Sequence, residues 1–310
     1  MIELESVTKL YGTVIGVNDI TLTLGPGAHG LLGPNGSGKT TFLNLVTGQL
    51  RPTRGDVIVF GESPWDNAAL YRRIGICPGF EGLYADISGY DWVRYLMQLH
   101  GFGAAEARRR AEDSLEIVGM AESMHRTMGS YSRGMRQRTK LAQAIAHEPE
   151  LLILDEPFNG LDPVGRHDIT QVLRDWVKCG GSIIIASHIL HEVETLATSF
   201  LLISGGRLLA SGTPEEVHSL LTDLPNEFLF RGAGLRELGR LLLEEKLVDS
   251  LRLEGEDRLI VTTHKPLHMT SRLPAWCANG EIRVTEITSG DDSLQDLFTT
   301  LMRIHRGELR

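Results

Sequence analysis

The spacing of apolar residues in the first two thirds of the chain indicates strands that alternate with helices. Residues 2–11 and 14–24 read as long strands, and the second of them alternates apolar and polar positions. Shorter apolar runs that end in loops predict further strands at residues 29–32, 56–60, 74–77, 151–154, 182–186 and 200–203. Because helical patterns separate these runs, we predict an α/β fold with a largely parallel sheet flanked by helices.

One stretch interrupts the alternation, from residue 88 to about residue 147, where only helical periodicity is found. It opens with Ser88 and Asp91, a capping-box arrangement in which side chains satisfy the free backbone N–H groups of a helix start. We therefore predict a helical subdomain, about residues 86–147, inserted into the α/β core.

The last part of the chain has its own order of elements. A helix start at Thr213 and Pro214 is followed by a turn-rich segment, residues 222–226, that reads as a linker. Beyond it we expect strand (227–230), helix, strand (248–253), strand (259–263), helix, strand (282–287) and helix. This order is typical of a small ferredoxin-like α+β domain. The sequence thus predicts two domains, residues 1–225 and 226–310.

Composition and charge disfavour several classes of protein. The net charge of −9 disfavours a general nucleic-acid surface, which needs a basic face, so we expect no nucleic-acid partner. The three cysteines, Cys77, Cys179 and Cys277, lack the number and spacing of a disulfide framework or a zinc knuckle and suit a reducing cytoplasm. The chain has neither an apolar run of about 18 residues nor the apolar segment of a secretion signal at its start. If it acts at a membrane, we expect it to do so as a peripheral subunit.

A glycine-rich segment between a predicted strand and a predicted helix carries the clearest chemistry. It fits the pattern G-x-x-x-x-G-K-[ST], with Gly33, Pro34, Asn35, Gly36, Ser37, Gly38, Lys39 and Thr40. The glycines let backbone N–H groups curl around phosphate oxygens, and the following helix points its positive end at them. We expect Lys39 to reach the β- and γ-phosphates of a nucleotide and the Thr40 hydroxyl to ligate Mg²⁺. A glycine-rich turn that binds nothing is the alternative, and the strand and helix on its two sides disfavour it.

Two acidic residues, Asp155 and Glu156, end the apolar run 151–154. An aspartate at the carboxyl end of a strand, beside a P-loop, can hold Mg²⁺ through water, and a neighbouring glutamate can polarise an attacking water. Alone, such a pair marks only the end of a strand. Next to the P-loop it predicts a phosphoryl-transfer site.

Further motifs follow the P-loop in order: the helical insert, residues 131–138, residues 154–157, residues 160–162, and Ser187 with His188. Their order and spacing resemble the ATP-binding cassette of ABC transporters over about residues 1–225. The resemblance implies a P-loop NTPase cassette with a mostly parallel sheet core, an antiparallel β subdomain and a helical insert. It also implies ATP and Mg²⁺ as cofactors.

The resemblance carries over roles for residues outside the P-loop. Tyr11 matches the aromatic residue that stacks on adenine; read alone, it is a half-buried strand tyrosine. Ser132 and Gly134 match the signature that completes the site from a second subunit; read alone, Ser132 is just a helix N-cap. Asp162 matches the loop that communicates between the two sites. His188 matches the switch histidine that positions the γ-phosphate and supports the catalytic glutamate.

The chain departs from the family pattern at two places. Gly79 stands where the family carries a glutamine that offers an oxygen to Mg²⁺ and couples the site to the membrane partner. Water or Glu81 is a candidate substitute for that oxygen. Arg133 stands at the usual middle glycine of the signature, between Tyr131 and Met135, as in similar exporter-type cassettes.

The function that the resemblance implies is an ATP-hydrolysing subunit that powers a separate membrane permease for export. Two copies would pair head to tail and sandwich two MgATP. The backbone of residues 33–41, including Thr41, and Lys39 would hold the phosphates. Thr40 and Asp155 would hold Mg²⁺, while Glu156 and His188 would be catalytic. The expected location is the cytoplasmic face of the cell membrane.

Two other functions stay open. A soluble ABC-family ATPase of repair, translation or iron–sulfur assembly is disfavoured by the single cassette, the acidic balance and the absence of sustained heptads between Lys39 and Ser132. A weakly hydrolysing regulatory cassette is suggested by Gly79, but the presence of both Glu156 and His188 speaks against it. For residues 226–310, whose segment 291–298 resembles the closing helix of accessory domains, a packing or dimer-stabilising module is favoured over ligand sensing.

Overall fold

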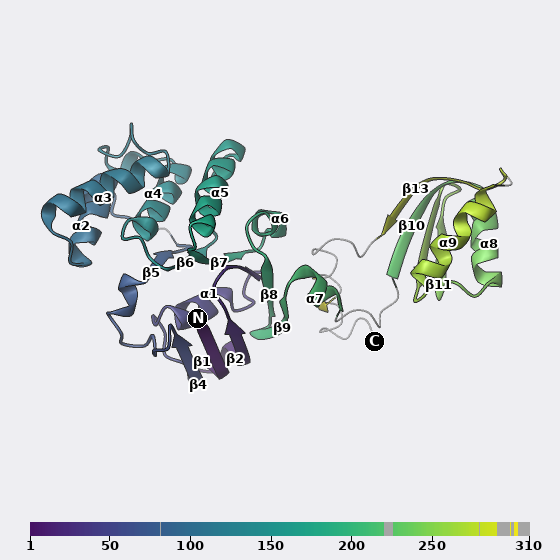
Figure 1. Cartoon of the computed structure of the whole chain (residues 1–310), viewed down its shortest axis with the longest axis horizontal. Helices are drawn as coiled ribbons and strands as arrows, with labels where there is room; N and C mark the ends of the chain where they lie inside the picture. Colours follow the sequence, from purple (N-terminus) through teal and green to yellow (C-terminus); the bar gives the residue numbers. More distant parts are fainter. Residues whose placement is uncertain (81, 220–225, 279, 290–297, 299–300, 303–310) are drawn as a thin grey trace. The chain divides into compact units, whose positions relative to one another are not determined.

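The computed structural model describes the chain except for residues 81, 220–225, 279, 290–297, 299–300 and 303–310 (Figure 1). The chain divides into two compact units, Met1–Thr213 and Pro214–Arg310. The division falls before helix α7 (Pro214–Ser219), whereas the sequence analysis placed the boundary after residue 225. The difference therefore concerns one short helix and residues outside the described part of the chain.

The core of the first unit is a six-stranded sheet that is parallel except for its last strand. Strands β3, β6 and β7 are buried on both faces, which explains their continuous apolar sequences. The strand that the sequence analysis did not predict is β9, which pairs antiparallel with β8 at the edge. The sheet runs in the order β5 (Ile74–Cys77), β6 (Leu151–Asp155), β7 (Ser182–Ser187), β3 (Ala28–Leu32), β8 (Ser199–Ser204), β9 (Arg207–Gly212).

A second, antiparallel sheet packs on the first through helix α1 (Lys39–Val46). Alternate residues of its central strand face inward, among them Ile2 and Leu4, and they share one core with Phe42 of α1 and Ile184 of β7. Burial of this apolar surface is what holds the P-loop helix between the two sheets. The sheet runs in the order β2 (Val14–Leu24), β1 (Ile2–Tyr11), β4 (Arg54–Val59).

The helical subdomain lies where the sequence predicts it. Ser88 caps α2 by accepting a hydrogen bond from the Asp91 backbone N–H at 3.0 Å, and its hydroxyl donates to the Asp91 carboxylate. The subdomain comprises α2 (Gly89–Leu99), α3 (Ala104–Ile117), the 3₁₀ turn η2 (Met128–Ser130) and α4 (Arg133–Ile145). Helices α5 (Pro163–Lys178) and α6 (Leu190–Glu194) complete the first unit.

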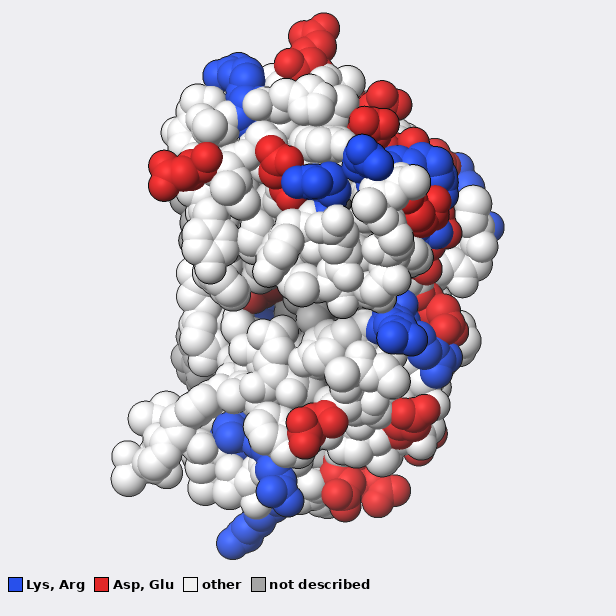
Figure 2. Space-filling view, turned by 90° about the vertical axis from the view of Figure 1, so that its left-hand side faces the viewer, with Lys and Arg blue, Asp and Glu red and all other residues white. Residues whose placement is uncertain are grey.

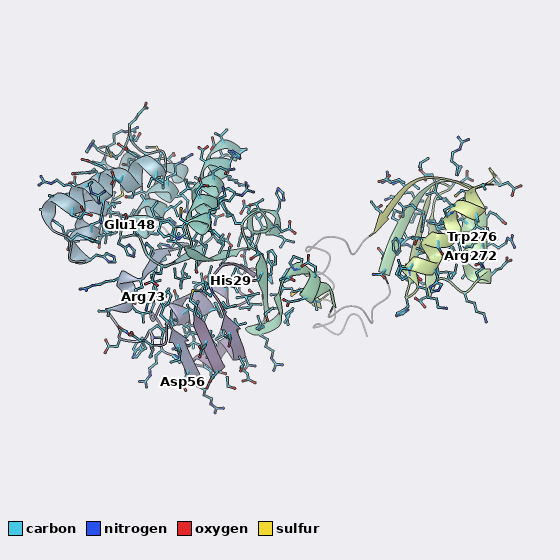
Figure 3. All side chains as sticks on the ribbon, viewed as in Figure 1. His29, Asp56, Arg73, Glu148, Arg272 and Trp276 are labelled. Atoms are coloured by element: carbon cyan, nitrogen blue, oxygen red, sulfur yellow. The ribbon has the colours of Figure 1, made fainter. Side chains whose placement is uncertain are left out.

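The second unit has its own core and four antiparallel strands in the order β11, β12, β10, β13. Its elements from residue 226 on follow as expected from the sequence, and Arg272 and Trp276 lie one turn apart on α9 (Figure 3). The ferredoxin-like assignment stays a prediction, and most of the last expected helix, residues 291–298, lies outside the described residues. The elements are β10 (Asn226–Ala233), α8 (Leu235–Glu244), β11 (Ser250–Glu254), β12 (Arg258–Thr263), α9 (Pro266–Cys277) and β13 (Arg283–Ser289).

Membrane-spanning segments were sought among the helices of the described residues. None of these helices combines the length and the apolar character needed to cross a bilayer.

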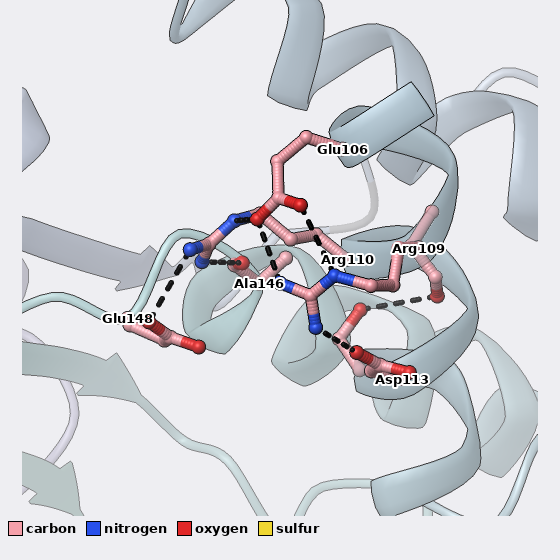
Figure 4. Close-up of polar contacts among 8 residues, drawn as sticks. Glu106, Arg109, Arg110, Asp113, Ala146 and Glu148 are labelled. Atoms are coloured by element: carbon pink, nitrogen blue, oxygen red, sulfur yellow. Dashed lines mark hydrogen bonds and ion pairs between the residues drawn. The ribbon is translucent and has the colours of Figure 1, made fainter. Parts of the chain in front are cut away.

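Arg110 of α3 ties the subdomain to the chain that follows α4 (Figure 4). Its guanidinium donates to the Ala146 carbonyl at 3.2 Å and to Glu148 at 3.3 Å, and it pairs with Glu106 at 2.6 Å. Its side chain is only 14% exposed, whereas that of Arg109 next to it is 55% exposed and pairs with carboxylates on the same helix.

We expect Arg110→Leu to lower the free energy of unfolding by about 2–3 kcal/mol, because a charge-assisted bond to a buried carbonyl is lost. The matched variant Arg109→Leu should change it little, since exposed pairs along one helix contribute little. Urea unfolding followed by circular dichroism measures both. Equal effects of the two variants would contradict this account of Arg110.

Candidate nucleotide-binding site

The P-loop connects the buried strand β3 to helix α1. A Cβ atom at Gly33 would meet the Ile203 carbonyl at 2.3 Å, and one at Gly38 would meet the Gly16 carbonyl at 2.4 Å. Gly38 also has φ of 110°, so only glycine fits these two positions. The N-terminus of α1 has no side-chain cap, which leaves its first N–H groups for an anion.

Lys39 is folded back onto the P-loop and is 7% exposed. Its Nζ donates to the Gly33 carbonyl at 2.7 Å and to the Pro34 carbonyl at 3.2 Å. Burial lowers the pKa of Lys39, and the nearby charges of Glu156 and Asp155 oppose that shift. The ammonium group thus lies at the mouth of the loop, where phosphate oxygens can replace its carbonyl partners.

Thr40 and Asp155 meet although they are far apart in the sequence. The Thr40 hydroxyl donates to Asp155 Oδ2 at 3.0 Å. Burial raises the pKa of Asp155, while the hydrogen bond from Thr40 and the charge of Lys39 act against the shift. A hydroxyl and a carboxylate oxygen fit Mg²⁺, which binds through one or two protein oxygens and fills its shell with water and phosphate. Among the described residues there is no group of three or more His, Cys, Asp and Glu side chains that could hold a metal ion by itself.

Glu156 and His188 form a hydrogen-bonded pair. His188 Nδ1 lies 2.8 Å from Glu156 Oε1, and the Ser187 hydroxyl donates to Oε2 at 3.3 Å. The backbone of Glu156 has φ of 51°, a conformation that costs a non-glycine residue energy, and its N–H donates to the Ala186 carbonyl at 2.8 Å. The fold therefore holds this carboxylate in a strained but fixed position beside Asp155. His188 precedes α6, which begins at Leu190.

Lys39, Thr40, Asp155 and Glu156 border a cavity of about 540 Å³, whereas His188 does not line it and meets it only through Glu156. Tyr11 is 45% exposed at its edge, and its hydroxyl lies 3.4 Å from Thr41 Oγ1. An exposed ring of this kind can stack on a planar base. The buried Ser37 Oγ makes no hydrogen bond within the described part of the chain, so its donor is available to a phosphate oxygen. The lining consists of Tyr11, residues 14–16, residues 35–41, Gly79, Phe80, Asp155 and Glu156.

The sequence analysis missed three residues at the start of β2. Val14, Ile15 and Gly16 line the cavity beside Tyr11. A Cβ atom at Gly16 would lie 2.7 Å from the Tyr11 ring, so the glycine makes room for the aromatic side chain. The signal was available in the sequence, because only two residues separate this strand from the one that carries Tyr11.

Ser132, Gly134 and Asp162 do not line the cavity. Ser132 caps α4 by accepting from the Met135 N–H at 3.2 Å, and Asp162 caps α5 by accepting from the Gly165 N–H at 2.8 Å. Both residues are exposed. The two segments contact each other, since the Gly160 carbonyl would lie 3.1 Å from a Cβ atom at Gly134. They form a surface of their own, separate from the P-loop.

Gly79 lies against the carboxylate of Asp155. A Cβ atom at position 79 would lie 3.0 Å from Asp155 Oδ2. The main chain of this loop thus occupies the space beside the acid, where the family's glutamine would begin. Glu81, the candidate substitute for its oxygen, lies outside the described residues.

Comparison with known proteins agrees with this geometry. The family model described as ABC transporter matches residues 17–159. The bacitracin transport ATP-binding protein of Bacillus licheniformis is 32% identical over 305 residues, which are 97% of both chains. Its counterpart in Enterococcus faecalis is 38% identical over 221 residues, 70% of this chain and 71% of that protein.

A comparison with solved structures finds the same fold in a known cassette. A dimeric ATP-binding cassette in a post-hydrolysis state with ADP and Pi superposes with a TM-score of 0.64 at 22% identity. The match covers 69% of this chain and 98% of that one, and it concerns the fold. On these likenesses, and on a P-loop, a threonine–aspartate pair and a glutamate in one cavity, the chain belongs to the ATP-binding subunits of ABC transporters and is an ATPase.

Proposed function

We propose that two copies of this chain close head to tail around two MgATP and thereby drive a separate membrane permease, for export. The observation that supports this proposal is that the expected site residues fall into two separate groups. Lys39, Thr40 and Glu156 border one cavity, whereas Ser132, which is exposed, and Gly134, which is half-buried, lie at the start of α4 and do not line it. A second copy facing the first would supply Ser132 to the other copy's nucleotide, and the similar cassette named above is a dimer.

Each described group has a role in this reaction. Lys39 and the backbone of residues 33–41 hold the phosphates, and Tyr11 stacks on the base. Thr40 and Asp155 hold Mg²⁺, which neutralises charge on the phosphate oxygens when bound. Glu156 accepts a proton from the attacking water, and His188 fixes the orientation of that carboxylate.

The permease is proposed to bind the side of the first unit that carries α2. Figure 2 looks onto this side and shows a band of uncharged surface between charged margins. Tyr95 and Leu99 are exposed on one face of α2, and Tyr84 and Phe80 are exposed in the loop that follows Gly79. This exposed apolar surface continues into the loop of residues 78–80, which we call the metal-site loop because it lies beside Asp155. Such a surface suits a partner whose movement follows nucleotide binding. In this proposal the chain lies peripherally at the cytoplasmic face of the membrane.

Glu156→Gln tests the proposed function directly. Loss of the base should lower ATP hydrolysis about 10²–10⁴-fold, and MgATP should then accumulate in a stable dimer. Phosphate release and light scattering after size-exclusion chromatography measure the two effects. The exposed Glu122→Gln serves as the control. Turnover and monomer content equal to those of the parent would show that Glu156 is not the base.

Ser132→Asp tests the division of the site between two copies. Aspartate is as good an N-cap as serine, so α4 should stay folded, but its charge would face the γ-phosphate of the other copy. In the Glu156→Gln background we expect the MgATP dimer to be lost. Binding of a fluorescent ATP analogue to the monomer should change less than about twofold, because Ser132 does not border its own cavity. A dimer that persists would contradict the arrangement.

Gly79→Ala tests the contact of this loop with Asp155. The added methyl group must displace the carboxylate, so the Mg²⁺ concentration for half-maximal hydrolysis should rise about tenfold. Gly103→Ala is the matched control, because nothing lies within 4 Å of a Cβ atom there. Gly79→Gln shares the crowding but adds an amide oxygen for Mg²⁺, so it should need less Mg²⁺ than Gly79→Ala.

A further inference from the structure

Helix α4 carries a buried lysine, Lys140, that is 3% exposed. Its Nζ donates to the Pro78 carbonyl at 2.8 Å and to the Phe80 carbonyl at 3.2 Å. A buried ammonium group is costly unless it is hydrogen-bonded and close to negative charge. Lys140 has these hydrogen bonds and also a negative charge nearby, because it lies near enough to Asp155 to interact with that carboxylate. An apolar side chain would fill this position at lower cost, so the charge calls for an explanation.

The two carbonyl groups that Lys140 binds flank Gly79. Glycine has no side chain with which to anchor a loop, and its backbone is the most permissive of all residues. Yet the main chain of Gly79 lies close to Asp155, where a Cβ atom would be 3.0 Å from Oδ2. The hydrogen bonds that Lys140 donates to the carbonyl groups of Pro78 and Phe80 hold the main chain of Gly79 in this position.

One turn earlier on α4, Gln137 binds the second segment of the site. Its Nε2 donates to the Pro157 carbonyl at 2.9 Å and lies 3.6 Å from Cys77 Sγ. Pro157 directly follows the catalytic Glu156. Gln137 and Lys140 are three residues apart, so they project from one face of the helix. This face therefore holds the loop after β5 and the loop after β6.

We propose that Lys140 is a positioning residue of the ATPase: it takes over the anchoring that a side chain at position 79 would provide, and it ties the metal-site loop to α4. Because Ser132 caps the start of α4, this tie links the surface that faces the second copy to the metal site of the same chain. The linking step rests on the proposed head-to-tail dimer. The anchoring of the Gly79 loop does not.

The test is Lys140→Met, which leaves an unbranched side chain one atom shorter and removes the ammonium donors and the charge. The Mg²⁺ concentration for half-maximal hydrolysis should rise about tenfold and kcat should fall, since the loop beside Asp155 is released. Binding of a fluorescent ATP analogue without divalent ion should stay within about twofold of the parent, because the hydrogen bonds of Lys140 to Pro78 and Phe80 hold a loop other than the P-loop. Lys140→Arg, which keeps the donors, should recover at least half of the lost kcat. Lys178→Met, at an exposed lysine, is the control.

A double variant separates positioning from simple loss of stability. If Lys140 acts through the Gly79 loop, Lys140→Met and Gly79→Ala should raise the Mg²⁺ requirement together by clearly less than the product of their separate effects. Additive effects, or unchanged Mg²⁺ dependence with only a lower melting temperature, would overturn the proposal. If Lys140→Met does not fold, Lys140→Gln replaces it with the same expected outcome. Failure of the proposed head-to-tail dimer is distinguishable, because it would appear as a monomer of Glu156→Gln with MgATP, whatever the Mg²⁺ requirement of the Lys140 variants.

Discussion

The parallel pairing of β6, β7 and β3 is the constraint on which the site depends. In this register Asp155 lies opposite Ala186, and Leu32 lies opposite Ser187, so the three strands end together. The P-loop, the acidic pair and His188 follow these strand ends directly, and the fold needs no long loop to bring them together. The backbone bond from Glu156 to Ala186 continues the ladder by one residue and holds the strained glutamate in place.

Helix α4 is the second organising element, and it acts from the other side of the site. Arg138 donates to the Val118 carbonyl at 2.6 Å and pairs with Asp168 of α5 at 3.0 Å. Together with Gln137 and Lys140, it bonds α4 to the end of α3, to α5 and to the loops that follow β5 and β6. A rigid helix with contacts at both ends can transmit a small displacement from one end to the other, because packed interfaces shift between discrete arrangements.

The sequence predicted the parts of the site that are local in the chain. The P-loop, Asp155 and Glu156 follow buried strands, so a pattern of apolar runs and their ends places them. Strand β9 was not predicted because it is half-exposed and lacks a clear apolar period. The contact of Lys140 with Pro78 spans 62 residues, and no local pattern encodes a pairing of that kind. The same holds for the crowding between Gly79 and Asp155, which depends on two neighbouring strand ends.

The two interpretations of Ser132, helix cap and ligand of the other copy's phosphate, turn out to be compatible. A hydroxyl group accepts and donates at once. Ser132 Oγ accepts the Met135 N–H, which leaves its own O–H free to donate to a phosphate oxygen in the proposed dimer. Asp162 is held in the same way, because its Oδ1 accepts the Gly165 N–H as the cap of α5. Capping therefore fixes these side chains before a second copy arrives, so less conformational entropy is lost when the dimer closes.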